Sequence, residues 1–295
     1  MTEIPHPLDH LVLPVSDLAE ARGRLTRLGF TVAPDGIHPF GTANCCVFFA
    51  DGTFLEPLAV ADRAIADAAA SAGNVFVRHD RDHRARNGEE GFSAVVFATG
   101  DATRDHARFV GSGISAGELL DFSREFATLE GGRDQAAFRL AFALGPDAPD
   151  CLFFTCERVR APDVDRTPLQ RHANGVTGVA GVLMTAPDPQ HLAGTLQQTA
   201  GAPPQPDGDG MVLRRGVFVL RVMTMDHFAD ETGLPDDGDG RTAFRALELA
   251  CQDMADLRRR LAAASIGFHE APAGLVVPPA PGQGAALIFR SPAAG

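Results

Sequence analysis

His10 and Glu56 are the two residues whose types and placement best suit them to chemistry. His10 opens an apolar strand in which Leu11 and Leu13 point to the opposite face, because side chains alternate along a strand. Glu56 lies in a second apolar strand, where a carboxylate is costly without a partner. An imidazole and a carboxylate that project into one concavity are ligands suited to Zn, Fe, Mn or Ni. The sequence therefore predicts one site built on these two strands.

The residue types that the chain lacks narrow the chemistry of that site. It contains no Tyr, no Trp and no Lys. Schiff-base catalysis and a Walker A phosphate loop both need Lys and are excluded. Any general acid or base must therefore be His, Asp, Glu or Cys. The five cysteines include no Cys-x-x-Cys pair, so we interpret them as buried thiols rather than as disulfides or a soft-metal site.

The composition is that of an acidic, globular protein. Its 295 residues suffice for one large domain or two moderate ones, and 45% of them are hydrophobic. A net charge of −12 argues against a surface that follows nucleic-acid phosphates. The sequence contains no run of about eighteen apolar residues, the length that a membrane-spanning helix needs. The first residues lack the regions of a signal peptide, so we expect a cytoplasmic protein with no nucleic-acid or membrane partner.

An internal repeat supplies the elements that position His10 and Glu56. At four places an apolar strand runs into a short turn that contains Asp, and a helix follows; the strands span residues 9–15, 92–98, 179–185 and 244–250. Asp17 or Ser16 is expected to cap the first of these helices, and Asp101, Asp188 and Asp253 stand at the aligned positions of the other three turns. Short strands follow each helix. The predicted unit is β-α-β-β-β, and the predicted fold is α+β with four such modules.

Polar or Pro-rich stretches separate the units at residues 78–90, 158–170 and 233–240. The first of them contains His79 and His83, which would share a face if the segment were helical. The dense charge of residues 78–86 instead favours a solvated linker.

Two motifs give the first unit a resemblance to a known family. The strand Asp9-His10-Leu11-Val12-Leu13 and the segment Asp51-Gly52-Thr53-Phe54-Leu55-Glu56 are similar to glyoxalase-like domains of the vicinal oxygen chelate superfamily. Residues 38–44 and 172–175 also resemble that group. The resemblance covers about residues 8–185 and implies that the modules pair into curved mixed β-sheets. With the repeat, it predicts a glyoxalase-like domain at 1–157, a linker at 158–177 and a second, degenerate pair of modules at 178–295.

The resemblance also implies a divalent metal in the cup of the sheet, with ligands from the first and last strands of each unit. In the first unit those strands supply His10 and Glu56. At the end of the second unit's last strand stands Glu157 or Thr155, and Glu157 is the predicted third ligand. In the other units, the positions equivalent to His10 hold residues that cannot bind a metal, namely Ala94, Gly181 and Ala246.

Other residues of the same motifs are predicted to complete the site. His38 or His172 could take the place of Glu157 in a three-ligand set. Glu56 and His38 are the predicted catalytic residues that transfer protons. The predicted substrate-binding residues are Thr42, Asn44, His172 and Asn174.

Two functions from different classes follow from the resemblance. The first is a metal-dependent enzyme that acts on a small, oxygen-rich metabolite by lyase, isomerase or dioxygenase chemistry, with the metal as Lewis acid. The second is a protein that binds a small molecule in the same cup without metal or catalysis, which the missing second His favours. Neither requires a nucleotide cofactor. Units three and four are expected to serve packing or contacts in a homodimer.

Overall fold

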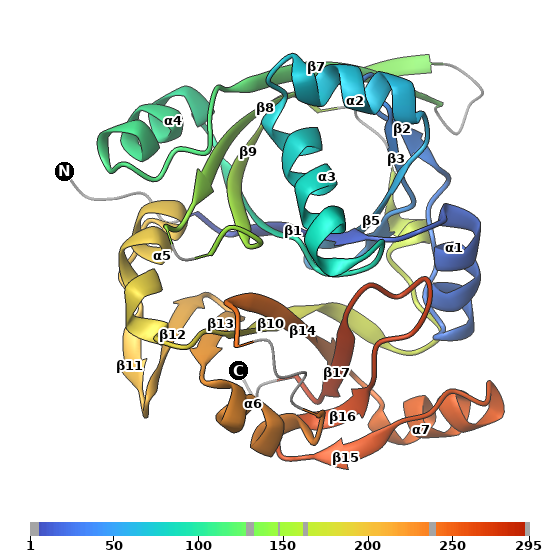
Figure 1. Ribbon diagram of the computed structural model, residues 1–295. Helices are drawn as coiled ribbons and strands as arrows, with labels where there is room; N and C mark the ends of the chain where they lie inside the picture. Colours follow the sequence, from blue (N-terminus) through green and yellow to red (C-terminus); the bar gives the residue numbers. More distant parts are fainter. Residues whose placement is uncertain (1–5, 128–132, 147, 162–164, 236–239, 293–295) are drawn as a thin grey trace.

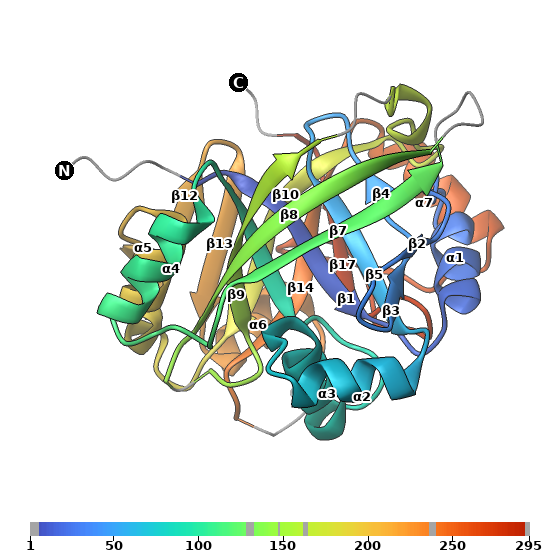
Figure 2. The same ribbon diagram turned by 90° about the horizontal axis from the view of Figure 1, so that it is seen from above.

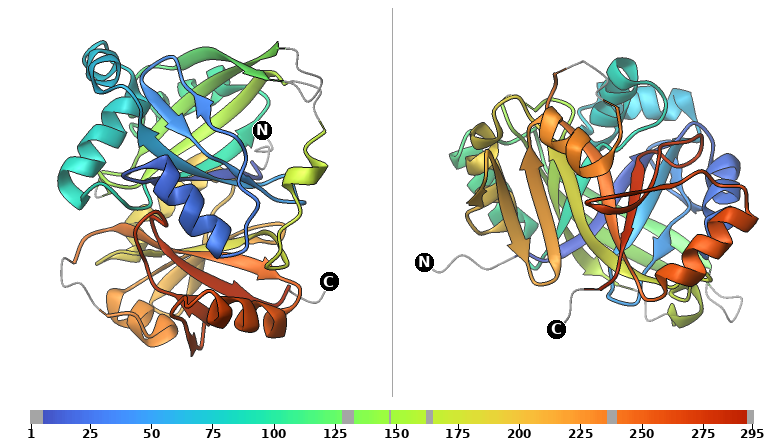
Figure 3. Two further views of the ribbon diagram at one scale, coloured as in Figure 1. Left: turned by 90° about the vertical axis from the view of Figure 1, so that its right-hand side faces the viewer. Right: turned by 90° about the horizontal axis from the view of Figure 1, so that it is seen from below.

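The computed structural model describes residues 6–127, 133–146, 148–161, 165–235 and 240–292. Two curved mixed β-sheets form the two halves of the protein, and helices lie against them (Figure 1). The first half is stacked on the second, as Figures 1 and 3 both show. The predicted α+β architecture of paired modules is confirmed.

The first sheet contains two copies of the predicted unit. β1 and β5 are parallel neighbours at its centre, β6 is antiparallel to β1, and β9 is parallel to β6. β7 and β8 form a long hairpin at one edge (Figure 2). The strands in spatial order are β2 (Gly36–Ile37), β3 (Thr42–Asn44), β5 (Phe54–Val60), β1 (Leu8–Pro14), β6 (Ala94–Thr99), β9 (Leu152–Arg160), β8 (Arg133–Leu144) and β7 (Leu120–Ala127), with β4 (Val47–Phe48) paired to β5.

The second sheet repeats this arrangement, except that its described residues form no counterpart of β4. β10 and β13 are parallel, β14 is antiparallel to β10, and β17 is parallel to β14. β10 therefore corresponds to β1, and β14 to β6. The strands in spatial order are β11 (Gln205–Asp207), β12 (Gly210–Arg215), β13 (Phe218–Met223), β10 (Val176–Thr185), β14 (Ala243–Cys251), β17 (Ala286–Arg290), β16 (Gly274–Val277) and β15 (His269–Ala271).

The predicted cap at Asp17 is confirmed, and the Asp residues of the other three turns cap the helices that follow them. Asp17 accepts a hydrogen bond from the main-chain N–H of Glu20 at the start of α1 (Leu18–Arg27). Equivalent bonds begin α4 (Ala102–Gly111), α7 (Met254–Ala263) and the short 3-10 helix Pro189–Leu192 that leads into α5 (Ala193–Ala200). Each bond satisfies a main-chain donor that the first turn of a helix leaves without a partner.

A continuous apolar core joins the two halves. It combines residues of the first sheet, such as Leu11, Leu13 and Phe153, with residues of the second sheet, such as Val182 and Leu247. These side chains lie on the back of each sheet, away from its concave face. The core fixes the strands of the first sheet from behind and leaves their opposite face free for a pocket.

The prediction of a solvated linker at residues 78–86 is wrong, because this segment lies within α3 (Val75–Asn87). This helix follows α2 (Arg63–Ser71) and packs Val75 and Phe76 into the core of the first sheet's concave side. Its charged residue Arg84 is buried and donates to the carboxylate of Asp80 (2.9 Å) and to the main-chain carbonyl of Leu58 (2.8 Å). Charge alone misled the prediction, since a guanidinium can be buried when carbonyl and carboxylate acceptors surround it.

The second sheet has its own covering helix, α6 (Met225–Thr232). Phe228 of this helix packs with Leu183 and Ile288 in an apolar cluster on the concave face. Within the described ranges, no helix combines the length and the apolar character that a membrane span requires.

Candidate ligand pocket

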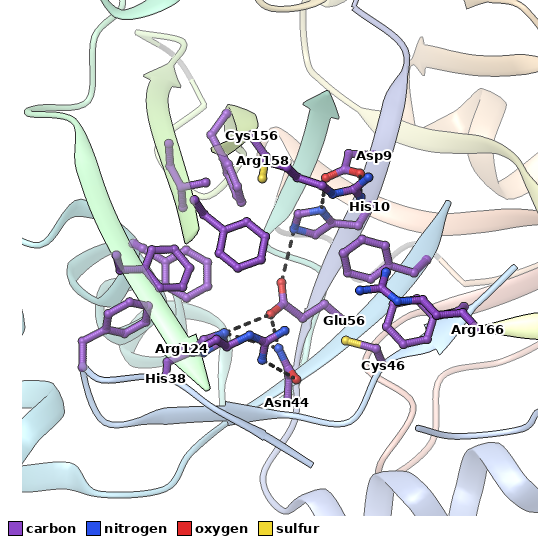
Figure 4. Close-up of a pocket in the computed structure, with 18 residues that line it drawn as sticks. Asp9, His10, His38, Asn44, Cys46, Glu56, Arg124, Cys156, Arg158 and Arg166 are labelled. Carbon is purple, nitrogen blue, oxygen red and sulfur yellow. Dashed lines mark hydrogen bonds and ion pairs between the residues drawn. The ribbon is translucent and has the colours of Figure 1, made fainter. Parts of the chain in front are cut away.

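A pocket opens on the concave face of the first sheet beside α3 and encloses about 650 Å³, part of which is open to solvent (Figure 4). Seven aromatic rings line it, and these are Phe40, Phe48, Phe54, Phe76, Phe122, Phe138 and Phe154. The ionisable residues that line it are Asp9, His10, His38, Cys46, Glu56, Arg124, Cys156, Arg158 and Arg166. Charged groups in an apolar wall interact strongly, because little water screens them.

The Glu56 carboxylate is the centre of the polar network in this pocket. One of its oxygens, Oε2, lies 3.3 Å from Nε2 of His10. The other, Oε1, accepts a hydrogen bond of 2.6 Å from Nδ2 of Asn44 and lies 3.7 Å from Nε2 of His38. The structure thus brings together four of the residues singled out from the sequence.

Both ring nitrogens of His10 face a carboxylate. Nδ1 lies 3.2 Å from Oδ2 of Asp9, and Nε2 faces Glu56. The register of β1 with β6 shifts between Leu8 and His10, and this irregularity lets Asp9 reach the pocket beside the imidazole. The Phe54 ring stacks on the imidazole at 4.4 Å. Since ionised carboxylates only accept hydrogen bonds, the arrangement holds His10 as an imidazolium that donates from both nitrogens.

The electrostatics of the pair agree with this protonation state. Burial disfavours the charged ring of His10, but hydrogen bonds to Asp9 and Glu56 and their charges outweigh it, so the pKa of His10 is raised above 6.5. Burial likewise disfavours the Glu56 carboxylate, yet contacts with His10, His38 and Asn44 lower its pKa to about 2. Each group stabilises the charged form of the other.

His38 is held differently, as a neutral imidazole. Burial lowers the pKa of His38 to about 4, although the charge of Glu56 opposes the shift. Its Nε2 lies 3.4 Å from the amide nitrogen of Asn44, a donor, and its Nδ1 lies 2.9 Å from Oγ1 of Thr42. We therefore assign the tautomer that carries its proton on Nδ1. Thr42 is fully buried behind this ring and does not line the pocket.

Three arginines that the sequence analysis missed add positive charge to the pocket. Arg158 forms an ion pair with Asp9. Arg166 lies over the Phe48 ring at 4.7 Å, and Arg124 lies 6.0 Å from the Phe138 ring centre. Within the described ranges, neither Arg124 nor Arg166 forms an ion pair with a carboxylate. Strand alternation could have identified Arg158, because it shares a face of β9 with Phe154 and Cys156, two further lining residues.

Arg124 also connects the two edges of the first sheet. It comes from β7, at one edge, and its guanidinium lies 3.5 Å from Oδ1 of Asn44 on β3, next to the other edge. Gly36 of β2 makes room for it, since a Cβ at that position would overlap the guanidinium. A side chain therefore spans the gap that remains where the curved sheet approaches closure.

The two cysteines of the pocket are protonated thiols. Burial raises the pKa of Cys46 and of Cys156 well above the usual value, and nearby carboxylates add to the effect. All five cysteines are buried and free, as predicted. A buried thiol with a raised pKa is a poor nucleophile, so these residues contribute shape rather than reactivity.

Two residues predicted to bind substrate lie away from the pocket. The His172 ring accepts a hydrogen bond from the Thr31 N–H (3.0 Å) and donates one to the Phe48 carbonyl (2.9 Å). Asn174 is buried and donates to the Leu28 carbonyl at 2.9 Å. Both tie the segment before β10 to the first half from behind the sheet, and this position does not support a substrate-binding role or a ligand role for His172.

Glu157, the predicted third metal ligand, also points away from the pocket. It follows Cys156 on β9, so its side chain emerges on the opposite face of the strand. Its carboxylate accepts a hydrogen bond of 3.0 Å from the main-chain N–H of Ala102 at the start of α4. A contact at a helix N-terminus satisfies a main-chain donor and suits a negative charge.

The donor set around Glu56 does not fit a divalent metal. His10 and His38 approach different oxygens of the carboxylate, which lies between them in Figure 4. A metal bound to His10 would have to displace a proton and the contacts of the ring with Asp9 and Glu56. In the part of the chain that is described, no group of three or more His, Cys, Asp or Glu side chains could hold a metal ion. The predicted metal remains a prediction that this arrangement does not favour.

Comparisons with known proteins place the chain among related folds. The family model described as "Glyoxalase-like domain" matches residues 8–200. No curated protein sequence matches at a significant level. Among solved structures, a hypothetical protein from Staphylococcus aureus has a TM-score of 0.64 at 13% identity and covers 96% of this chain and 98% of its own.

Two further structures carry names that state an activity. A mutant of 4-hydroxymandelate synthase from Streptomyces coelicolor has a TM-score of 0.59 at 15% identity, covering 99% of this chain and 94% of its own. The Mn(II)-bound glyoxalase from Novosphingobium aromaticivorans has a TM-score of 0.51 at 10% identity, covering 98% and 83%. At these identities the likeness establishes a shared fold and leaves the chemistry of this pocket to its own residues.

Proposed function

The chain belongs to the glyoxalase-like domain family, and we propose that the pocket in its first sheet binds a small organic anion with an aromatic or apolar body, without a metal ion. The observation that carries the proposal is the pair of guanidinium groups, Arg124 and Arg166, that line an aromatic pocket and form no ion pair with any carboxylate of the described residues. An anionic head group on the ligand would supply that partner.

The aromatic wall supports a ligand with an apolar body. Seven phenylalanines line the pocket, and burial of apolar ligand surface against them supplies the main driving force for binding. Aromatic rings also accept edge-to-face contacts from an aromatic ligand. A fully polar metabolite would lose its hydration in this pocket and regain few hydrogen bonds.

The charges of the pocket support an anionic head group. Among the lining residues, the guanidinium groups of Arg124, Arg158 and Arg166 outnumber the carboxylates of Asp9 and Glu56. Since the His10 imidazolium adds further positive charge, the pocket has a positive excess within a chain of net charge −12. A bidentate contact between a guanidinium and a carboxylate is the strongest neutral-pH interaction that this set offers.

Metal-assisted lyase, isomerase or dioxygenase chemistry is the alternative that the family suggests. The residues present do not favour it, since His10 is committed to two carboxylates and Glu157 caps a helix. Glu56 is also a weak base at a pKa of about 2, whereas an efficient general base has a pKa near the working pH. A binding role is therefore the better fit to this pocket.

Calorimetric titration tests the proposal, because a chain without Trp or Tyr has no useful intrinsic fluorescence. The probes are benzoate, phenylacetate and 3-phenylpropionate, each paired with its neutral amide. At least one acid should bind, and its amide should bind about tenfold more weakly or worse. Arg166→Gln and Arg124→Gln should each lower the affinity for the acid by a similar factor. Arg160→Gln is the matched control, since this exposed arginine pairs with Asp134 outside the pocket.

Three results would contradict the proposal. One is the absence of binding by every acid, and another is equal affinity for acid and amide. The third is stoichiometric Zn, Fe, Mn or Ni in the purified or metal-loaded protein that disappears in His10→Ala and Glu56→Ala. That last result would instead establish the metal-assisted function.

A further inference from the structure

Two guanidinium groups of the ligand pocket, those of Arg124 and Arg166, have only neutral partners among the described residues. Arg166 lies over the Phe48 ring at 4.7 Å, and its guanidinium donates no hydrogen bond to another described residue. Arg124 lies 6.0 Å from the Phe138 ring centre, and its hydrogen bond to Oδ1 of Asn44 is long, at 3.5 Å. Aromatic rings and an amide oxygen carry no net charge, so these contacts leave both guanidinium groups without a counter-charge.

The other charged groups that line the pocket are paired with one another. The Arg158 guanidinium forms an ion pair with Asp9, and the His10 imidazolium lies against Glu56 at 3.3 Å. These two pairs use both carboxylates of the lining. His38 adds no charge, because burial lowers its pKa to about 4. The charge that remains without a match in the pocket is therefore that of the two unpaired guanidinium groups.

These two guanidinium groups converge on one part of the pocket. Arg124 comes from β7 and Arg166 from the segment after β9, and the two lie on either side of Cys46 in Figure 4. Burial raises the pKa of the Cys46 thiol, and both guanidinium charges act on it in the opposite direction. Burial and the nearby charges of Arg158 and Arg124 lower the pKa of Arg166. Like charges thus repel one another beside a thiol that is neutral and does not repel an anion.

We propose that the ligand of this pocket is a dianion; this inference rests on the function proposed above and specifies the charge of its head group. A monoanion would leave one guanidinium charge unmatched in an aromatic pocket, whereas a dianion matches both. The head group lies between Arg124 and Arg166, beside the neutral thiol of Cys46. A phosphate monoester and a pair of adjacent carboxylates both carry this charge, and both offer oxygen atoms to two guanidinium groups.

Two matched pairs of ligands test the charge of the head group, by calorimetric titration at about pH 7.5 and constant ionic strength. Phenyl phosphate and phenyl sulfate have similar shapes, but the phosphate carries nearly two charges at this pH and the sulfate carries one. Phthalate and benzoate differ by one carboxylate. At least one dianion should bind about tenfold more tightly than its monoanion, or better. A preference in the first pair alone identifies a phosphate monoester, and one in the second pair alone identifies a dicarboxylate; either supports the dianion.

Variants show whether the two arginines supply this preference. Arg124→Gln and Arg166→Gln each remove one charge, so each should lower the affinity for the dianion more than that for the monoanion and bring the two affinities close together. Arg259→Gln removes an exposed arginine of α7 that pairs with Asp256, and it should change neither affinity. Circular dichroism and the melting temperature establish that each variant is folded. Since the two pocket variants are independent, either one decides the question if the other fails that check.

The outcomes separate this inference from the proposed function. If phenyl sulfate and benzoate bind as tightly as the matching dianions, the pocket still binds an organic anion, but the inference of a dianion is overturned. The inference is also overturned if the preference for the dianion is unchanged in the folded pocket variants, or if Arg259→Gln reduces it as much as they do. If neither the dianions nor the monoanions bind, the inference and the proposed function both fail.

Discussion

Strand alternation predicts the orientation of some residues of the pocket and not of others. It placed His10 and Glu56 on one concave face from sequence alone, because the two-residue period of a strand is a local property. It could not place Asp9, since the irregularity that turns this side chain to the same face depends on pairing between β1 and β6. Arg124 and Arg166 were missed for a similar reason: their neighbours in the pocket come from strands that are distant in the sequence.

The buried pair formed by His10 and Glu56 should give the protein a characteristic pH dependence. The pKa of His10 is raised when folded, so its contribution to stability is complete below pH 6.5 and is lost as the pH rises through the folded pKa. The pKa of Glu56 is lowered to about 2, so its contribution is complete above pH 4.5 and is lost as the pH falls. Both contributions are complete between pH 4.5 and 6.5.

Glu56→Gln should therefore lower the free energy of unfolding most in that window, by about 3 kcal/mol, because it leaves a buried imidazolium with one partner fewer. Urea unfolding followed by far-ultraviolet circular dichroism, from pH 3 to 8, measures the difference. Arg160→Gln, at an exposed ion pair, is the control and should show a small, flat difference. If the loss of unfolding free energy in Glu56→Gln did not vary with pH, His10 and Glu56 would not form the ion pair described.

At the scale of elements, the four caps were predictable and α3 was not. A cap depends on one Asp and the next three residues, so the sequence pattern is sufficient to identify it. α3 depends on acceptors for Arg84 that come from β5 and from the end of β1, which no local pattern reveals. Glu157 shows the same limit, because it binds the N–H of Ala102 at a helix 55 positions away.

Removal of a cap should have a measurable and uniform cost. Asp17→Ala, Asp101→Ala and Asp253→Ala should each lower the free energy of unfolding by about 1 kcal/mol, because each leaves a main-chain N–H of the first helical turn without its partner. For a chain of this length the melting temperature should fall by about 2 °C, as measured by scanning calorimetry. Asp67→Ala, at an exposed position within α2, should leave it unchanged or slightly higher, since Ala is the better helix former. Equal effects at all four positions would contradict the capping role.

The whole molecule consists of two similar sheets that differ in what their concave faces hold. In the first sheet that face carries the pocket. In the second, α6 packs onto it, and at Gly181, the equivalent of His10, a Cβ would overlap the fully buried carboxylate of Glu248. Arg221 and Arg290 donate to this carboxylate at 2.8 Å. The prediction that the second pair of modules serves packing is consistent with this arrangement, while a homodimer remains a prediction.

The shared core behind the sheets should make the two halves unfold together. Because its apolar residues come from both sheets, neither half can lose structure without exposing the core of the other. Scanning calorimetry should give one transition, with a calorimetric enthalpy equal to the van't Hoff enthalpy. Two separate transitions, or a ratio of enthalpies well above one, would show that the halves are independent.

The link that Arg124 makes between β7 and Asn44 has a consequence for how molecules reach the pocket. In a fully closed barrel, a bulky guest could pass between strands only by breaking main-chain hydrogen bonds. Here Arg124 reaches across the gap to Asn44 at 3.5 Å, beside the contact of the Phe122 and Phe40 rings, and an incoming carboxylate is a stronger acceptor for the guanidinium than an amide oxygen. A bound carboxylate would thus replace Asn44 as the partner of Arg124, and docking would itself remove one of the contacts that join the two edges of the sheet.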